Sequence, residues 1–350
     1  MAVCAGAQAQ DGPNVLIGGW VKDREHFAIA TNPLLYPLDI IEDQTLYLEP
    51  KLDEKNEFRT YISFDRPFYV RYVDNGVLIK GVYAMPGDQW WLKVADGRGS
   101  LSGSNKTLQG LLTKLQPYFE NTEVELTDTA VFATHNRAEF ITYQQERRKK
   151  ALRYVIEHFI GLPPLEMEMR KLLESEINYS YALKMLRYSR SKGKEKRFVF
   201  RYNDYMDALL EVPANDPGAM GSPAYAQYIY ELPYSLWYAE VNWNMTDKPP
   251  YTKIVADQYT MRDSLAKKYF KGAVYELALY AILLDVVKDA AKKKGTPEFD
   301  AAYNQSNDII NRMSKRFTNN LYYSRVRSKL EELVAVQREE TKSKPKPKRK

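Results

Sequence analysis

Four glutamates between residues 164 and 190 are the first candidates for acid–base chemistry. They are Glu166, Glu168, Glu174 and Glu176. Two carboxyl groups that flank a glycosidic bond can serve as general acid and as nucleophile or base. Basic side chains are interspersed with these carboxylates, namely Arg170, Lys171 and Lys184. This pattern is typical of a solvated helix face with ion pairs, so we expect a charged surface and no glycosidase centre.

The histidines His26, His135 and His158 are the candidates for metal binding. They lie far apart in the sequence, none has the H-x-x-x-H spacing, and no cysteine ligand lies near them. A metal ion needs several ligands that converge on one point. We therefore expect no metal site and assign these histidines to the surface or to helix packing.

Motifs for nucleophiles and phosphate groups are absent from the sequence. The segment Gly99–Gly103 contains serines, but not in the G-x-S-x-G frame of a serine hydrolase. The segment Gly97–Gly103 lacks the Lys-Ser/Thr ending of a phosphate-binding loop, and Gly18 and Gly19 fall inside a predicted strand. Cys4 is the single cysteine, so no thiol pair exists. We expect no catalytic residue, no cofactor-binding residue and no cofactor.

Trp90 and Trp91 are the candidate ligand-binding residues, and Trp20 lies in the same part of the chain. Consecutive side chains of a strand point to opposite faces, so we expect one of the pair in the core and the other at a surface. The exposed indole would then offer an aromatic platform to a peptide or a glycan. Simple packing of the rings is the alternative.

The charge distribution predicts a balanced folded body with a basic tail. Six of the 51 basic residues fall in the last nine positions, so the remaining 45 equal the number of acidic residues. A nucleic-acid-binding domain carries its excess charge on the folded surface, so no nucleic-acid partner is expected for the body. The tail over residues 341–350 alternates Lys and Pro and is expected to be disordered. An anionic lipid, an acidic partner, nucleic acid or solvation alone would each explain it.

A second basic cluster, Arg147–Lys150, is followed by Arg153 in a predicted helix. Four consecutive residues spread around a helix and form no single stripe. We therefore expect a solvated helix face here rather than a binding surface.

Residues 1–10 are interpreted as the remnant of a secretory signal peptide. The segment is small and apolar, and Ala7–Ala9 fits the A-x-A pattern of a cleavage site. Export to the periplasm or cell envelope is therefore expected, and a merely flexible N-terminus is the alternative. Cleavage after Ala9 would leave a mature chain without cysteine and hence without disulfides.

Residues 11–104 are expected to form an antiparallel β-sandwich domain. The predicted strands are 15–21, 44–48, 57–64, 68–72, 77–83 and 89–94. They are rich in β-branched and aromatic residues, several of them alternate, and turn formers separate them. The pair Asn75 and Gly76 is the strongest hairpin signal, because both residues tolerate positive φ.

Residues 105–340 are expected to form an all-helical domain, so the predicted class is α+β. The predicted helices are 106–115, 133–159, 164–190, 202–210, 223–241, 253–269, 272–294, 297–317 and 324–340. No apolar heptad is sustained, which favours a helical array over a coiled coil. The apolar run Tyr275–Val287 is shorter than the roughly 20 residues that span a bilayer, so no transmembrane segment is expected.

Two short motifs accompany this order of elements. Met85–Asp88 is a Pro-Gly-Asp turn, and Leu101–Asn105 is a Ser-Gly-x-Asn element that leads into a helix and a long Tyr-rich helical region. Over roughly residues 14–335 the chain resembles the part that precedes the thioredoxin domain in TlpA-like (redoxin-type) envelope thiol-disulfide proteins of Gram-negative bacteria. That family reacts through Cys-x-x-Cys, which this sequence lacks. No family catalytic residue can therefore be carried over.

These patterns together predict a non-enzymatic envelope protein that binds or positions an unknown protein or peptide partner. The alternative is a peptide- or glycan-binding module that uses the β-sandwich through Trp90 or Trp91. An enzyme based on scattered carboxylates is a more distant alternative. The patterns do not specify the ligand, the partner or the oligomeric state.

Overall fold

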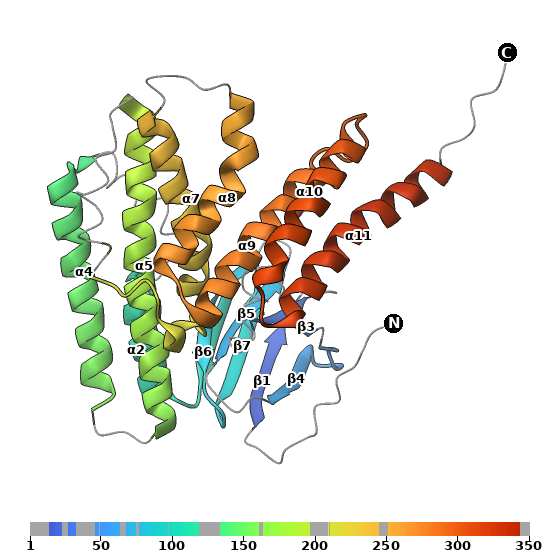
Figure 1. Cartoon of the computed structure of the whole chain (residues 1–350). Coiled ribbons are helices and arrows are strands. Elements are labelled where there is room, and N and C mark those ends of the chain that lie inside the picture. The colour runs from blue at the N-terminus through green and yellow to red at the C-terminus, as the bar shows by residue number, and fades with distance from the viewer. Residues whose placement is uncertain are drawn as a thin grey trace. The chain divides into compact units, whose positions relative to one another are not determined.

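A computed structural model gives the arrangement of the chain (Figure 1). It describes residues 14–22, 27–32, 46–48, 50–63, 68–74, 77–96, 98–118, 134–160, 164–196, 209, 211–244 and 251–343. Cys4, His26, the Asn75-Gly76 hairpin, the helix predicted over 202–210 apart from Leu209, and the tail beyond residue 343 lie outside the described residues. The chain divides into two compact units, residues 1–185 with 218–227 and residues 186–217 with 228–350.

The class is α+β, because a strand-rich N-terminal part precedes a helical region. The strands are β1 (Asn14–Val21), β2 (Ala28–Asn32), β3 (Leu46–Leu48), β4 (Glu57–Ser63), β5 (Phe68–Asp74), β6 (Val77–Ala84), β7 (Gln89–Ala95) and β8 (Arg98–Gly103). Sheet A has the order β4-β1-β7-β8, and sheet B has the order β3-β2-β5-β6. The strands β2 and β8 were not predicted from the sequence.

The expectation that the strands are purely antiparallel is wrong, because β1 and β7 pair in parallel. The other described pairings are antiparallel. Parallel neighbours need a long crossover connection. The chain between β1 and β7 provides one, since it forms the strands of sheet B and the edge strand β4 of sheet A.

Two predicted turns hold sheet A in register. At the first, Asp53 Oδ1 accepts hydrogen bonds from the backbone N–H groups of Lys55 and Glu57, each at 2.8 Å. At the second, Asp88 Oδ2 accepts from the Met85 N–H at 2.8 Å, and Gly87 has a φ of 92°. Positive φ is accessible to glycine without a steric penalty, so the Pro-Gly-Asp turn can deliver the chain directly into β7.

Three helices complete the first unit: α2 (Lys106–Leu115), α4 (Arg137–His158) and the part of α5 (Pro164–Lys196) that ends at Met185. Asn105 caps α2 by accepting from the Leu108 N–H at 3.0 Å. Asn136 and Glu139 form a reciprocal capping box at the start of α4. A 3₁₀ turn, η1 (Gln116–Tyr118), follows α2.

The core of the first unit contains residues from the sheets and from the helices together. Its buried members include Val15, Ile17, Trp90 and Leu92 from sheet A, Leu108 and Leu111 from α2, Val155 from α4, and Leu173 and Ile177 from α5. The described core residues of sheet A and of the helices therefore belong to one cluster.

The second unit is built around a buried helix. Its elements include α7 (Pro223–Asn244) from Tyr228 onwards, α8 (Tyr251–Tyr269), α9 (Gly272–Ala291), α10 (Phe299–Met313), η3 (Ser314–Arg316) and α11 (Asn320–Ser343). The short 3₁₀ turn η2 (Pro217–Ala219) lies at the boundary, and only Pro217 of it belongs to the second unit. The central helix α9 contacts α8, α10 and α11 and is buried on nearly all sides. None of the helices in the described part of the chain combines the length and apolarity needed to cross a membrane.

The division between the units differs from the predicted boundary after Ser104. It falls inside α5 and α7, at Met185 and Gln227. At the C-terminal end, α11 continues to Ser343, beyond the predicted end at Glu340.

Candidate functional site

The structure places the two candidate tryptophans on opposite faces of β7. Trp90 is 2% exposed and belongs to the core, whereas Trp91 is 37% exposed. Burial alternates along the whole strand, so the expected split of the pair is confirmed. Because its ring is buried, Trp90 does not present a ligand-binding surface, and the candidate site narrows to Trp91.

The register of sheet A defines which residues share the outward face with Trp91. They form three rows across the strands: Tyr61, Leu16 and Gln89; Arg59, Gly18, Trp91 and Ser102; Glu57, Trp20, Lys93 and Ser100. We call this surface the Trp91 face. The inward neighbours on the same strands, such as Ile17, Phe58 and Leu92, are buried.

Each tryptophan lies against a glycine of a neighbouring strand. A Cβ atom at Gly18 of β1 would come within 2.7 Å of the Trp91 ring, and a Cβ at Gly103 of β8 would come within 2.8 Å of the Trp90 ring. Such distances are shorter than van der Waals contact, so only glycine leaves room for the rings. The missing side chain at Gly18 therefore seats the Trp91 indole on the sheet.

Aromatic and basic groups surround Trp91 on its face. Tyr61 is 64% exposed. The Lys93 ammonium lies 5.9 Å from the centre of the Trp20 ring, within the range of a cation–π contact. Arg59 is exposed on the edge strand β4. The face can thus offer flat apolar surface and the positive charges of Arg59 and Lys93 to a bound molecule, with the carboxylate of Glu57 in the same row as Lys93.

The four glutamates proposed as carboxylate candidates are not brought together as a reactive pair. Glu168 is exposed, and Glu174 pairs with Arg170 at 2.7 Å, as a solvated helix face predicts. Glu176 is different, because it is only 4% exposed and accepts from the Ser222 hydroxyl at 2.7 Å and the Ala224 N–H at 3.1 Å. Its carboxylate accepts hydrogen bonds from groups at the N-terminus of α7. The expectation that Glu176 lies on a solvated, charged surface is therefore wrong.

The two described histidines also lie apart. His135 contacts the hydroxyl of Thr134, and its ring is near that of Tyr143. His158 packs against Phe159, and burial, assisted by the charge of Lys114, lowers its pKa. Within the described ranges, no three His, Cys, Asp or Glu side chains are placed to hold a metal ion.

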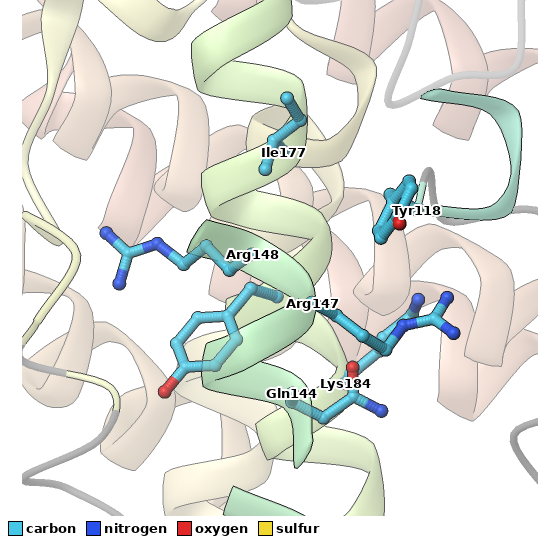
Figure 2. Close-up of a pocket in the computed structure, with 7 residues that line it drawn as sticks. Tyr118, Gln144, Arg147, Arg148, Ile177 and Lys184 are labelled. Atoms are coloured by element: carbon cyan, nitrogen blue, oxygen red, sulfur yellow. The ribbon is translucent and has the colours of Figure 1, made fainter. Parts of the chain in front are cut away.

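The basic cluster Arg147–Lys150 divides between the solvent and a small pocket (Figure 2). Lys149 and Lys150 are exposed as predicted, but Arg147 and Arg148 are half-buried. The pocket has a cavity volume of about 10 Å³ and lies among η1, α4 and α5 of the first unit. Its lining is Tyr118, Gln144, Arg147, Arg148, Ile177 and Lys184, together with Tyr181. We call it the Arg147 pocket.

Lys184 contradicts the expectation of a solvated helix most directly, since it is only 2% exposed. It follows a run of buried residues on α5, Tyr181–Leu183. The long aliphatic stem of a lysine can pack among such neighbours while its ammonium reaches a polar region. Here the ammonium-bearing side chain lines the Arg147 pocket.

Buried charges in the second unit form structural networks. Arg262, 2% exposed, pairs with Asp285 at 2.7 Å, and Asp285 also accepts from the Tyr230 hydroxyl at 3.0 Å. Burial, together with the charge of Asp285, raises the pKa of Tyr230 above its ordinary value. Asp263 is bound by Lys267 and Arg316 and by the hydroxyl of Tyr275. These acids are engaged in holding α8, α9 and the η3 turn together.

Comparisons with protein-family models, with curated proteins and with solved structures gave no match for this chain. The resemblance to the TlpA-like region therefore stays a prediction. Function is therefore inferred from a surface of the chain itself, the Trp91 face.

Sequence reasoning identified Trp91 and Trp20 but missed Tyr61 and Arg59. The alternation in Glu57–Ser63 was the available signal, because it places Arg59 and Tyr61 on one side of their strand. The register between strands then joins that side to the face of Trp91, and the register is not visible in a single sequence.

Proposed function

We propose that this protein is a non-enzymatic binding protein of the cell envelope, and that a protein or peptide partner docks on the Trp91 face. The observation that carries the proposal is the position of Trp91 itself. Its ring is seated on Gly18 at the centre of a sheet face, with Tyr61 exposed on the same face. An exposed tryptophan in a fixed position is the kind of anchor that dominates protein interfaces.

The composition of the face supports a protein or peptide partner. Trp, Tyr and Arg are the residues most enriched at interface hot spots, and Trp91, Tyr61 and Arg59 all lie on this face. Arg59 and Lys93 add positive charge at its rim. A matching partner would bring an apolar or aromatic side chain to the centre and carboxylates to the edge.

The non-enzymatic part of the proposal is supported by the way the described acids are used. Glu176 binds the start of α7, Asp285 binds Arg262, and Asp263 binds Arg316. Groups engaged in this way position helices rather than face an open cleft. The envelope location and the kinship with the TlpA-like region belong to the same proposal and rest on the sequence motifs. A sandwich arrangement of the two sheets is also part of the proposal, and the contact between β6 of sheet B and β8 of sheet A supports it.

The first test is binding to a peptide array and a glycan array by the purified chain, followed by calorimetry on the best ligand. Replacing Trp91 by alanine removes the central anchor, so we expect the affinity to fall by about tenfold or more. Tyr323→Ala is the matched control, because Tyr323 is an aromatic residue of similar exposure, 38%, on α11. Its replacement should leave the affinity unchanged.

Two results would overturn the proposal. One is equal binding by the Trp91→Ala variant and the unmodified chain, which would place the ligand elsewhere. The other is turnover in a disulfide-reduction assay by the purified chain alone, which would make it an enzyme.

A glycan is the second candidate ligand. The specific observation in its favour is the ring of Trp91 with polar neighbours on both sides of its strand, among them Ser102 on β8. A sugar can place its C–H groups on an indole while its hydroxyl groups bind such side chains. Binding on the glycan array, without binding on the peptide array, would favour this candidate.

A further inference from the structure

The strand β4 is an edge of sheet A, since β1 is its one neighbour in the described part of that sheet. An edge strand carries backbone N–H and C=O groups that its own sheet does not use. Arg59 and Tyr61 are exposed residues of this strand. The direction of their backbone groups decides whether the edge can bind another strand.

The hydrogen bonds between β1 and β4 give that direction. The N–H of Val21 on β1 donates to the carbonyl of Asn56 at 2.9 Å. In an antiparallel ladder, hydrogen-bonded and non-hydrogen-bonded pairs alternate. Counted from this bond, the β4 residues that bond to β1 are Phe58, Thr60 and Ile62. The backbone groups of Arg59 and Tyr61 therefore point away from β1, toward the open edge.

Glu57, in the same alternation, shows the outward direction directly. Its N–H donates to Asp53 Oδ1, and its carbonyl accepts from the Asp53 N–H, each at 2.8 Å. The turn at Asp53 therefore closes the edge at this end of β4. The corresponding groups of Arg59 and Tyr61 have no hydrogen-bond partner among the described residues. Each of these two residues can exchange a pair of hydrogen bonds with an added strand.

The side chains of Arg59 and Tyr61 indicate which strand fits. Both side chains lie on the Trp91 face, and no ion pair joins Arg59 to Glu57, its neighbour on that face, in the described structure. Opposite charges directly across two strands stabilise a sheet, and like charges destabilise it. An acid opposite Arg59 and an apolar residue opposite Tyr61 are therefore favoured. A second copy of the chain fits less well, because Glu57, the one acid of β4, lies where the edge is closed.

We propose that the open edge of β4 binds an extended, acidic peptide segment of a partner protein, which adds to sheet A as an antiparallel strand. In strand addition, the backbone hydrogen bonds give affinity and alternate side chains give specificity. The antiparallel direction is the more stable per residue. The edge lies two strands from β7, so the proposal goes beyond docking at Trp91, and neither proposal depends on the other.

The probe is a synthetic heptapeptide with blocked ends, whose third residue is tryptophan, whose fifth is glutamate and whose other residues are threonine. Amide hydrogen exchange is followed by NMR on the full chain. Without the probe, we expect fast exchange at Arg59 and Tyr61 and slow exchange at Thr60 between them. Saturating probe should slow exchange at Arg59 and Tyr61 by about tenfold or more. Unchanged exchange at both residues would overturn the proposal.

Two N-methylated forms of the probe test the backbone ladder on the unmodified chain. In the proposed register, the N–H of the fifth probe residue donates to the carbonyl of Arg59, whereas the N–H of the fourth points away from β4. Methylation of the fifth nitrogen should weaken binding by about tenfold or more, and methylation of the fourth by less than about threefold. Equal affinity of the two methylated probes would contradict strand addition.

Charge reversal tests the acidic character of the partner. Arg59→Glu should weaken binding of the glutamate probe by about fivefold or more, and a probe with lysine at the fifth position should bind this variant better than the unmodified chain. Arg153→Glu is the matched control, because it makes the same charge change at an exposed position of α4. Equal losses in the two variants would indicate a general charge effect and refute the acidic preference.

Sedimentation of the full chain without a probe examines the competing occupant, a second copy. We expect no dimer that depends on Arg59. A dimer that is lost in the Arg59→Glu variant would assign the edge to self-pairing and would overturn the proposal. If Arg59→Glu does not fold, the methylated probes on the unmodified chain still decide between strand addition and its absence.

Discussion

Asp88 occupies a position in which its charge opposes folding while its hydrogen bonds support it. Its side chain accepts from the Met85 N–H, and its own carbonyl accepts from the Leu16 N–H at 3.1 Å, so it ties the Pro-Gly-Asp turn to β1. The residue is 7% exposed. Burial raises the pKa of Asp88 above its ordinary value, although the hydrogen bond from Met85 acts in the opposite direction.

This raised pKa predicts a pH dependence of stability. Between the ordinary pKa of 3.8 and the raised value, the folded state binds more protons than the unfolded state. The contribution of Asp88 to the free energy of unfolding therefore falls as the pH rises through that window. Asp88→Asn keeps an acceptor for Met85 and removes the charge, so the variant should gain stability relative to the unmodified chain as the pH rises from about 4 to 7.

Denaturant unfolding of both chains at a series of pH values measures this effect. The difference between the two free energies isolates Asp88 from other titrating groups, such as His158, which has a pKa lowered by burial and titrates equally in both chains. A difference that does not change with pH would show that the charge on Asp88 is not penalised in the fold.

At the scale of elements, buried carboxylates bind the N-terminal ends of helices that follow much later in the chain. Glu176 on α5 binds the first turn of α7 through Ser222 and Ala224, and Ser222 itself accepts from the Tyr225 N–H. Glu276 on α9 binds the two residues that immediately precede α11, through the Thr318 hydroxyl and the Asn319 N–H. The first N–H groups of a helix lack intrahelical acceptors and carry partial positive charge, so a carboxylate is a favourable partner.

Replacing Glu176 by glutamine should lower the free energy of unfolding by about 1–3 kcal/mol, because a charged acceptor is lost from a buried helix terminus. Glu174→Gln is the matched control on the same helix. Glu174 makes a partly exposed ion pair with Arg170, so its loss should change stability by less than about 1 kcal/mol. Denaturant unfolding of the two variants checks both values. Equal effects would contradict the capping role of Glu176.

The elements themselves were largely predictable where local signals are strong. The bounds of α2 agree with the prediction at both ends, because Asn105 caps it and a proline follows it. The strand β7 was predictable from its aromatic and aliphatic composition. In contrast, β8 was missed because its sequence, RGSLSG, contains one large apolar residue and is a strand only through its pairing with β7.

The candidate sites were predictable only in part, for a similar reason. Alternation along β7 predicted that one of Trp90 and Trp91 would be exposed, but the rest of the Trp91 face depends on strand register. The Arg147 pocket depends on which faces of α4 and α5 meet. Lys184, flanked by apolar residues, was the one local sign of it, since a lysine inside a buried run needs a polar environment.

At the scale of the molecule, the strand region and the helices that follow it share one core. The inward face of sheet A and the buried residues of α2, α4 and the first part of α5 belong to a single hydrophobic cluster. The compact unit that contains them extends to Met185 and includes residues 218–227. A boundary after Ser104 would therefore cut through a core rather than between two cores.

This arrangement predicts that the strand region does not fold alone. A fragment of residues 11–104 would expose the apolar residues that pack against α2, α4 and α5, including Trp90 and Leu92. Each of these side chains contributes about 1.5–3 kcal/mol when it is buried, so exposing several of them costs an amount comparable to the roughly 5–15 kcal/mol by which domains are stable. We expect that fragment to lack cooperative thermal unfolding and amide NMR dispersion, whereas a fragment of residues 11–244, which retains all the described residues of the first unit, shows both. Cooperative unfolding of the shorter fragment would instead establish a self-sufficient strand domain, and the shared cluster would then be an interface between two folded parts.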